Sequence, residues 1–214
     1  MNSRQVLDML DSNRIEELRK KLQDDIYEKS LKTKSGAKQR YTAMKKYFKY
    51  HTSARECLQK PCKIKFEGED YISFTNSWSL VLTKEDCGEI ELFNEENSKY
   101  PDVGRLIRFD GIKKKMDFND VIAQAKALGY RLNKAEVDSR FKFLMLYDGT
   151  YYKIGLIDAS WSIIDDGEIA LTYHPDGERM PMTIQTSLGM AMIMPVKFEG
   201  EPGEDHIVIE VPCD

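Results

Sequence analysis

The side chains that could carry acid–base or nucleophilic chemistry are spread along this sequence and form no catalytic motif. His51 lies in a basic stretch, His174 in a His-Pro-Asp-Gly turn and His206 near the end of the chain. None accompanies a Gly-x-Ser-x-Gly elbow or a reactive-cysteine signature, and the sequence has no phosphate-binding glycine loop. We therefore expect a protein that is not an enzyme and that uses no cofactor.

The cysteines give little sign of a metal site. Cys57, Cys62, Cys87 and Cys213 form no Cys-x-x-Cys pair, and the histidines lie far from one another. A zinc site needs ligands that are clustered at short spacings. We expect reduced thiols and no metal.

Two acidic turns are the remaining candidates for ion binding. They read Asp-Asp-Gly at residues 165–167 and Asp-Gly-Glu at residues 176–178. Carboxylate oxygens suit a weakly bound calcium ion, but an Asp-Gly pair is first a signal for a tight hairpin turn. We favour the turn at both places.

Length and composition fit a soluble protein with a real core. The chain has 214 residues, 41% of them apolar and 32% charged, which suits one large domain or one domain with a small appendage. No apolar run approaches the roughly 20 residues that span a bilayer, and the first residues lack the apolar centre of a signal peptide. We expect a cytoplasmic protein that has no membrane partner.

Charge is distributed unevenly along the chain. Residues 29–65 contain twelve basic residues and a single acid, Glu56, which gives this segment a net charge of +11. Because the whole chain carries −4, the remainder carries −15. A charge imbalance of this size indicates which partners the protein attracts rather than which fold it adopts. The basic segment would attract a polyanion, and the acidic remainder would avoid one.

Two helical segments are expected in the first part of the chain. Residues 1–36 form the first, which ends in a linker and has Ile15, Leu18, Leu22 and Ile26 at helical spacing. Residues 37–58 form the second. Its apolar side chains share one face, and they are Tyr41, Met44, Tyr47, Phe48, Ala54 and Leu58. Its candidate DNA-binding lysines are Lys38, Lys45, Lys46 and Lys49. Any surface helix also shows lysines to water, so this basic side has two interpretations.

The rest of the chain reads as strands around one more helix. The helix covers residues 117–128 and has Asp117 as its cap. Strands are predicted at residues 62–67, 71–75, 78–83, 89–93, 141–147, 151–157, 167–173, 182–186, 190–198 and 206–211. Antiparallel hairpins with helices on one face make an α+β layer. We expect the helices at 37–58 and 117–128 to pack side by side on one face of a mostly antiparallel sheet, with Phe48 and Val121 buried.

Three short stretches carry a resemblance to a known family. They read YISFTNSWSLVL at residues 71–82, YPDVGRL at residues 100–106 and MAMIMPVKF at residues 190–198, the last preceded by the strand PMTIQT. Together, and in this order, they resemble the bacterial DNA polymerase sliding clamp, the β subunit of polymerase III. That family has a threonine-aspartate-glycine-aromatic-arginine-leucine motif, a phenylalanine-proline-aspartate stretch, and a final strand that closes in methionine-proline-hydrophobic-arginine.

The resemblance implies a clamp-like α+β domain over residues 37–198. Residues 1–36 precede it, and residues 199–214 would be an acidic tail or an edge strand. In the family the three motifs line a hydrophobic pocket that accepts short linear peptides of replication proteins. By position, the pocket here would involve Thr75, Ser77, Trp78, Leu80, Pro101, Arg105, Leu106, Ile193, Met194, Pro195 and Val196. Methionines suit a pocket that adapts to several peptides.

The sequence departs from the family in its motifs and its length. Asn76 replaces the aspartate, Ser77 the glycine and Ser79 the arginine. The first two motifs lie closer together than in the family, and the chain has room for about one clamp domain where the bacterial protein has three. A ring around DNA would therefore need several copies of this chain.

Two functions are compatible with these patterns. The first is a non-catalytic, DNA-associated binding module that resembles a sliding clamp domain and serves replication. Its basic helix would contact the phosphates of double-stranded DNA without reading bases, and the chain would form a homo-oligomer. The second is a protein–protein adaptor of a mobile element that keeps the clamp-like fold without encircling DNA. The basic helix would then meet an acidic protein.

Overall fold

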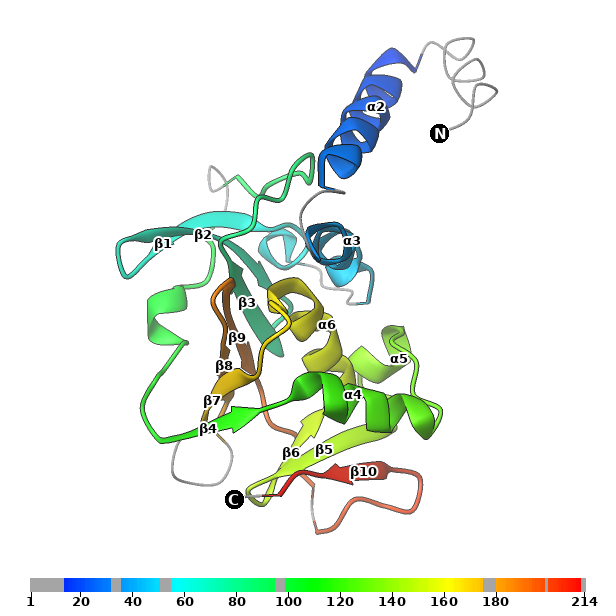
Figure 1. Ribbon diagram of the computed structural model, residues 1–214, viewed down its shortest axis with the longest axis vertical. Helices are drawn as coiled ribbons and strands as arrows, with labels where there is room; N and C mark the ends of the chain where they lie inside the picture. Colours follow the sequence, from blue (N-terminus) through cyan, green and yellow to red (C-terminus); the bar gives the residue numbers. More distant parts are fainter. Residues whose placement is uncertain are drawn as a thin grey trace.

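The computed structural model describes residues 14–31, 36–50, 55–94, 99–174, 180–198 and 200–212. These residues form a mixed α+β structure with a seven-stranded sheet, a three-stranded sheet and helices packed against both (Figure 1). The α+β class that the sequence patterns predicted is confirmed.

The seven-stranded sheet is antiparallel throughout, in the order β1-β2-β3-β9-β8-β7-β4. Its strands are β1 (Cys62–Phe66), β2 (Glu69–Thr75), β3 (Ser79–Thr83), β4 (Ile112–Met116), β7 (Ala170–His174), β8 (Met182–Gln185) and β9 (Gly189–Ile193). Strands β3 and β9 join the early and late parts of the chain at the centre of the sheet. A side chain at Gly189 would meet the carbonyl oxygen of Leu82 at 2.0 Å, so this pairing requires a glycine.

The helices of the main body lie on one face of this sheet. They are α3 (Ala37–Tyr47), α4 (Phe118–Ala127), the short α5 (Lys134–Val137) and α6 (Ile154–Ile164). Helix α6 packs on β3 and β9, and α3 and α4 each pack against α6 (Figure 1). The prediction that the two outer helices are neighbours was therefore wrong, because α6 lies between them.

The sequence patterns did not predict α6 because the helix is buried on nearly every side. Ten of its eleven residues are buried, Asp158 and Ser160 among them, so the helix lacks the solvent-facing stripe of charged residues that reveals a helix at 3.6-residue spacing. The strand expected at residues 151–157 ends at Lys153, and the helix begins at the next residue. Gly155 permits the close contact with α5, since a Cβ there would lie 2.5 Å from the carbonyl oxygen of Glu136.

Helix α3 is shorter than predicted. It ends at Tyr47 and continues as two 3-10 turns, Phe48–Tyr50 and Glu56–Leu58, while residues 51–54 lie outside the described part. The Phe48 ring stacks on that of Phe74 in β2 at 5.8 Å, which draws the chain toward the sheet at this point. Phe48 is only partly buried, contrary to expectation. Two further corrections concern strands: residues 89–93 form a loop, and β4 was not predicted.

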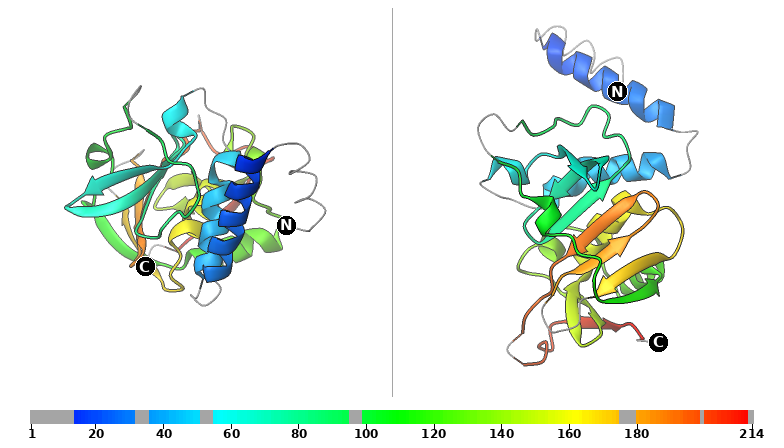
Figure 2. Two further views of the ribbon diagram at one scale, coloured as in Figure 1. Left: turned by 90° about the horizontal axis from the view of Figure 1, so that it is seen from above. Right: turned by 90° about the vertical axis from the view of Figure 1, so that its left-hand side faces the viewer.

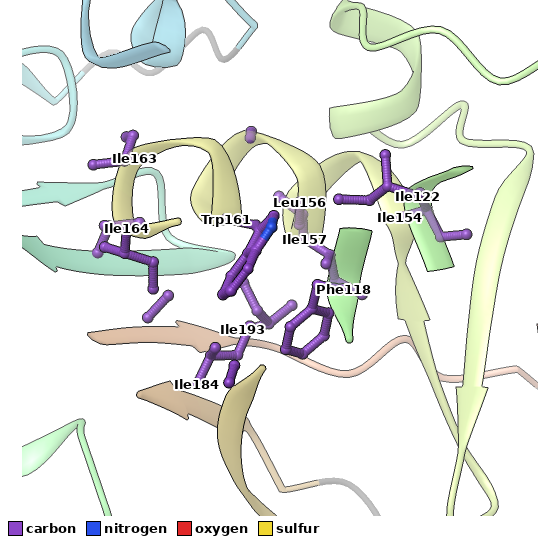
Figure 3. Packing of buried hydrophobic residues seen from close by; sticks show 14 of the residues in the cluster. Phe118, Ile122, Ile154, Leu156, Ile157, Trp161, Ile163, Ile164, Ile184 and Ile193 are labelled. Atoms are coloured by element: carbon purple, nitrogen blue, oxygen red, sulfur yellow. The ribbon is translucent and has the colours of Figure 1, made fainter. Parts of the chain in front are cut away.

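The main core lies between the helices and the sheet (Figure 3). Trp161 of α6 stands at its centre, 5.3 Å from the Phe118 ring of α4, and its indole N–H donates to Asn119 Oδ1 at 2.9 Å. Val121 is buried, as predicted. Asp117 caps α4 by accepting a bond from the Asp120 N–H, also as predicted.

The smaller sheet contains the predicted hairpin and closes it with a distant strand. Strands β5 (Phe143–Tyr147) and β6 (Thr150–Lys153) flank the Asp148-Gly149 turn, where both residues have positive φ. Strand β10 (Ile207–Glu210) pairs with β5 in parallel. The acidic end of the chain therefore supplies an edge strand.

Helix α2 (Ile15–Ser30) lies beyond α3, at the opposite end of the molecule from β10 (Figure 2). Of its predicted apolar stripe only Leu18 is buried, and Ile15, Leu22 and Ile26 are exposed. Residues 1–13 and 32–35 lie outside the described residues, and with them Lys34 and Ser35 of the predicted linker. Gly36, the last residue of that predicted linker, is described and precedes α3.

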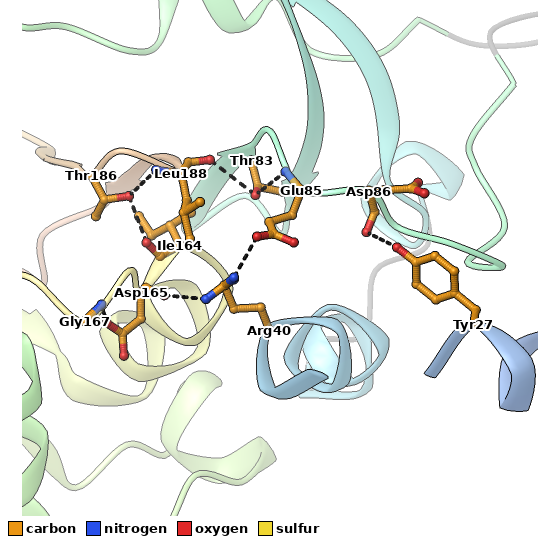
Figure 4. A network of polar contacts seen from close by, with 10 residues as sticks. All are labelled: Tyr27, Arg40, Thr83, Glu85, Asp86, Ile164, Asp165, Gly167, Thr186 and Leu188. Atoms are coloured by element: carbon orange, nitrogen blue, oxygen red, sulfur yellow. Dashed lines mark hydrogen bonds and ion pairs between the residues drawn. The ribbon is translucent and has the colours of Figure 1, made fainter. Parts of the chain in front are cut away.

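Polar contacts fix α3 between the sheet and α6 (Figure 4). The Arg40 guanidinium pairs with Glu85 Oε1 at 2.7 Å and donates to the carbonyl oxygen of Asp165 at 3.1 Å. The Tyr27 hydroxyl of α2 donates to the Asp86 carbonyl oxygen at 3.1 Å, next to the same loop. Arg40 thus sets the position from which α3 presents its other side chains.

Candidate functional site

Among the described residues, no three histidine, cysteine, aspartate or glutamate side chains gather closely enough to hold a metal ion. The carboxylates of the acidic turn at 165–167 accept backbone hydrogen bonds. Asp165 Oδ1 accepts the Gly167 N–H at 2.8 Å, and Asp166 accepts the N–H groups of Glu168 at 3.0 Å and Ser187 at 2.9 Å. The second acidic turn, at 176–178, lies outside the described residues. None of the helices in the described part is both long and apolar enough to cross a membrane.

Side chains from all three clamp-like stretches meet in one hydrophobic cluster on the sheet face that the helices leave uncovered. The cluster contains Leu80, Leu82, Tyr100, Val103, Ile107, Met190 and Met192, with Met194 packed against it. Alternate residues of β3 point to opposite faces, so Val81 enters the main core instead. The Tyr100 hydroxyl anchors the second stretch through a bond to the Ser73 carbonyl oxygen at 3.1 Å.

Trp78 stands at the turn between β2 and β3 and is 47% exposed. The turn is fixed by the buried Asn76, whose Oδ1 accepts the N–H groups of Trp78 at 3.0 Å and Ser79 at 2.7 Å. Ser77 adopts a positive φ of 72° between them. Thr75 Oγ1 closes the turn with a bond to the Ser79 carbonyl oxygen at 3.0 Å. Trp78 is therefore presented outward by a rigid support.

The end of β9 runs beside this tryptophan. The Met194 N–H donates to the Trp78 carbonyl oxygen at 2.9 Å, and the Val196 N–H donates to the Tyr151 carbonyl oxygen at 2.8 Å. A surface hollow of about 750 Å³ follows, and its lining includes Pro195, Val196, Tyr151 and Phe198. The first and third stretches thus meet at one surface, where the two sheets adjoin.

Lys153, which the sequence patterns did not single out, lies at the same place. The residue is 5% exposed, and its Nζ lies 4.9 Å from the centre of the Trp78 ring and 4.5 Å from that of Phe141. The ammonium donates to the Asp138 carbonyl oxygen at 2.9 Å. Burial holds the pKa of Lys153 below its ordinary range, although the nearby Asp138 carboxylate opposes this effect.

The remaining predicted pocket residues fall into three groups: buried, partly buried and exposed. Leu80 and Ile193 are fully buried, and Thr75 is almost so, which places them beneath the surface. Arg105 and Leu106 are exposed, and Arg105 Nε pairs with Asp102 at 3.0 Å. Pro101, Met194, Pro195 and Val196 are partly buried. The residues that hold the second stretch on the sheet are Tyr100, Val103 and Ile107, and Pro101 and Leu106 flank them in the sequence.

Two of the four candidate DNA-binding lysines, Lys38 and Lys45, pair with acids of helix α2. Lys45 Nζ pairs with Asp24 at 2.6 Å and with Glu28 at 2.8 Å, and Lys38 lies 3.8 Å from Glu28. Burial raises the pKa of Asp24, but bonds from Lys45 and the Tyr41 hydroxyl outweigh it and hold that pKa below its ordinary value. The other two candidates, Lys46 and Lys49, are exposed.

No protein-family model, curated protein or solved structure matches this chain. The surface at Trp78 and the lysines of α3 are the features of this chain that bear on its function.

Proposed function

We propose that this chain is a non-catalytic binding module that resembles a sliding clamp domain. It docks short linear peptides of replication proteins on the surface around Trp78, and it associates with double-stranded DNA through α3. The observation that carries the proposal is Trp78 itself: a large aromatic side chain, half exposed, on a turn that Asn76 holds rigidly.

An exposed tryptophan in this setting favours recognition over a structural role. Tryptophan is enriched at the centres of interfaces, where its truncation often costs about 2 kcal/mol or more in binding. A preformed turn loses little conformational entropy when a partner binds. Met194, which is partly buried directly after β9, and the hollow beside Pro195 adjoin this anchor. Leucine or phenylalanine side chains of an extended peptide would suit it.

Fluorescence can test the docking surface directly. Trp161 is replaced by Phe, so that Trp78 is the sole tryptophan, and a clamp-binding peptide is titrated. We expect a saturable change in Trp78 emission that is absent for a peptide whose leucine and phenylalanine anchors are replaced by alanine. Unchanged emission up to millimolar peptide, with the fold intact, would leave a clamp-like shape without the docking function.

The DNA-associated part of the proposal depends on α2. Asp24 and Glu28 occupy the positions at which phosphates would meet Lys45 and Lys38. Phosphate contacts supply affinity without base readout, and Lys46 and Lys49 are the candidate lysines that remain exposed. We therefore propose that α2, through Asp24 and Glu28, occupies the lysines of α3 and lowers the affinity for DNA until it is displaced.

The contact between α2 and α3 also favours a second candidate function, the protein–protein adaptor of a mobile element. The basic helix already pairs with Asp24 and Glu28 of its own chain, so an acidic segment of another protein could take the same place. Salt-sensitive retention on duplex DNA distinguishes the two functions. It is expected for the DNA-associated module and not for the adaptor.

A further inference from the structure

Lys153 combines burial, charge and position in a way that points to a ligand. It is the last residue of β6 and immediately precedes α6, so both sheet and helix fix its backbone. Its ammonium lies between the Trp78 and Phe141 rings and donates to the Asp138 carbonyl oxygen. Among the described residues it forms no salt bridge, although the Asp138 carboxylate is close enough to influence its pKa.

This environment satisfies the ammonium only in part. A lysine ammonium has three protons to donate, and a buried charge is costly unless it is paired and hydrogen-bonded. Two aromatic faces contribute about 0.5–2 kcal/mol each at most, which offsets a share of that cost. A carboxylate arriving from outside would supply the missing counter-charge.

The position of the ammonium makes such an arrival feasible. One of its two rings belongs to the exposed Trp78, so a ligand that covers the indole binds to the same side chain that Nζ contacts. Lysine is a compact charge whose donors rotate freely, which suits a single carboxylate at the border of an apolar surface. The nearby Glu201 is engaged elsewhere, accepting a bond from the Tyr151 hydroxyl at 3.0 Å.

We propose that Lys153 is the charge-selective part of the docking surface, and that the peptide accepted there carries an aspartate or glutamate beside its apolar anchors. This inference rests on the proposed peptide docking at Trp78. The peptide's carboxylate accepts a bond from Lys153 Nζ, while its leucine or phenylalanine side chains cover Trp78 and Met194.

The test begins with displayed random heptapeptides, selected on the full chain. Selection is repeated on Trp78→Ala, Lys153→Met and Lys153→Arg. Lys197→Met is the matched control, because Lys197 is an exposed lysine in the lining of the neighbouring hollow. The best peptide and a twin with Asn or Gln in place of its acid are then titrated calorimetrically. Thermal unfolding of each variant confirms that it is folded.

We expect enriched peptides to contain an acid, and the neutral twin to bind the wild-type chain about tenfold more weakly, equivalent to about 1.4 kcal/mol. On Lys153→Met the two peptides should bind within about twofold of each other. Lys153→Arg and Lys197→Met should keep the preference. If Lys153→Met fails to fold, the comparison of twin peptides on the wild-type chain and on Lys153→Arg decides the question.

Two kinds of failure are distinguishable. Peptides that need Trp78 but bind equally well with and without their acid, or that keep the acid preference on Lys153→Met, would overturn the role of Lys153 and leave the docking surface intact. Peptides that bind Trp78→Ala as well as the wild type, or an absence of enriched peptides, would overturn the docking surface and this inference together.

Discussion

Asn76 is a buried side chain that fixes the turn on which the exposed Trp78 lies. Its Oδ1 accepts bonds from the Trp78 N–H, the Ser79 N–H and the Ser79 hydroxyl. An amide oxygen at this position does the work of a turn-forming aspartate, since both side chains can accept bonds from the backbone two and three residues ahead. The asparagine that departs from the clamp motif is therefore compatible with the same turn.

Replacing Asn76 tests this role. Asn76→Ala removes the shared acceptor and leaves buried donors without a partner, which costs about 1–3 kcal/mol. Asn76→Asp retains an acceptor in the same place and should be the milder change. Urea unfolding of the two variants gives the comparison. Equal losses for both would show that the turn does not depend on this acceptor.

Truncation of Trp161 should mainly lower the free energy of unfolding, and truncation of Trp78 should mainly weaken peptide binding. Trp161 is in the core, where an aromatic-to-alanine change typically costs 3–5 kcal/mol. Trp78 is half exposed, so Trp78→Ala should lower the free energy of unfolding by only about 1 kcal/mol while abolishing peptide binding. Chemical denaturation and peptide titration on the same samples separate the effects. An unfolded Trp78→Ala chain would make Trp78 a structural residue.

His174 makes stability depend on pH in the acid range. Burial holds its pKa below the ordinary value, against the weaker opposing effect of Asp148 3.8 Å away. The unfolded imidazole titrates near its ordinary value of about 6.5. The neutral, buried imidazole therefore makes its full contribution to the free energy of unfolding above that pH. The contribution is lost as the pH falls through the pKa of His174 in the folded protein, which is the lower of the two values.

A variant isolates this contribution of His174. We expect His174→Gln to lose less stability than the wild type between pH 7 and pH 5, measured by urea unfolding at several pH values. Groups that the two proteins share cancel in the difference. Parallel curves for the two proteins would contradict the assignment.

At the scale of elements, α2 and α3 form a charged pair whose strength governs access to the lysines. Lys45 is about one-third exposed, and partly exposed ion pairs contribute about 0–1 kcal/mol each. The edge-to-face contact of Tyr27 with Tyr41, at 4.9 Å between ring centres, adds a modest further term. These contacts are weak enough for a polyanion to compete with α2.

Removing the charges of Asp24 and Glu28 should free the lysines of α3 for DNA. In the double variant Asp24→Asn/Glu28→Gln we expect tighter binding to duplex DNA, equally for unrelated sequences, measured by fluorescence anisotropy at low salt. Each added phosphate contact steepens the salt dependence by roughly 0.9 in log affinity against log salt. The charge reversal Lys38→Glu/Lys45→Glu/Lys49→Glu should weaken binding. Unchanged affinity in both variants would exclude this surface.

The success of the sequence patterns differed between elements for physical reasons. Helix α4 has a cap and one buried stripe, and its bounds were predicted closely. Helix α6 has almost no exposed side, and the apolar residues at its start are typical of a buried strand. Lys153 was overlooked for the same reason, because a lysine within a supposed strand reads as an ordinary solvent-facing residue. Its burial depends on Phe141 and Trp78, which are distant from each other in sequence.

At the scale of the whole molecule, both edges of the large sheet are rich in lysine. Strand β1 carries Lys63 and Lys65, and β4 carries Lys113, Lys114 and Lys115. Charged edge strands discourage pairing between sheets. A ring built by joining these edges would place lysine beside lysine, which disfavours the homo-oligomer that a clamp of single-domain chains would require.

We therefore expect the mass of a single chain in sedimentation equilibrium at physiological salt. When duplex DNA is added, the mass of the complex should exceed that of the free duplex by one chain for each occupied site. A closed oligomer that survives at low protein concentration would contradict this expectation, and it would indicate that a surface other than the sheet edges joins the copies.

The parallel pairing of β10 with β5 has a consequence for synthesis of the protein. Ile207 pairs with Phe143, 64 residues earlier in the chain. The β5–β6 hairpin therefore leaves the ribosome well before its third strand exists, and Phe143 and Met145 begin with an unpaired backbone edge. During that interval the nascent hairpin offers a template to any passing extended chain. The edge of β5 therefore stays open to misassembly until translation has produced β10.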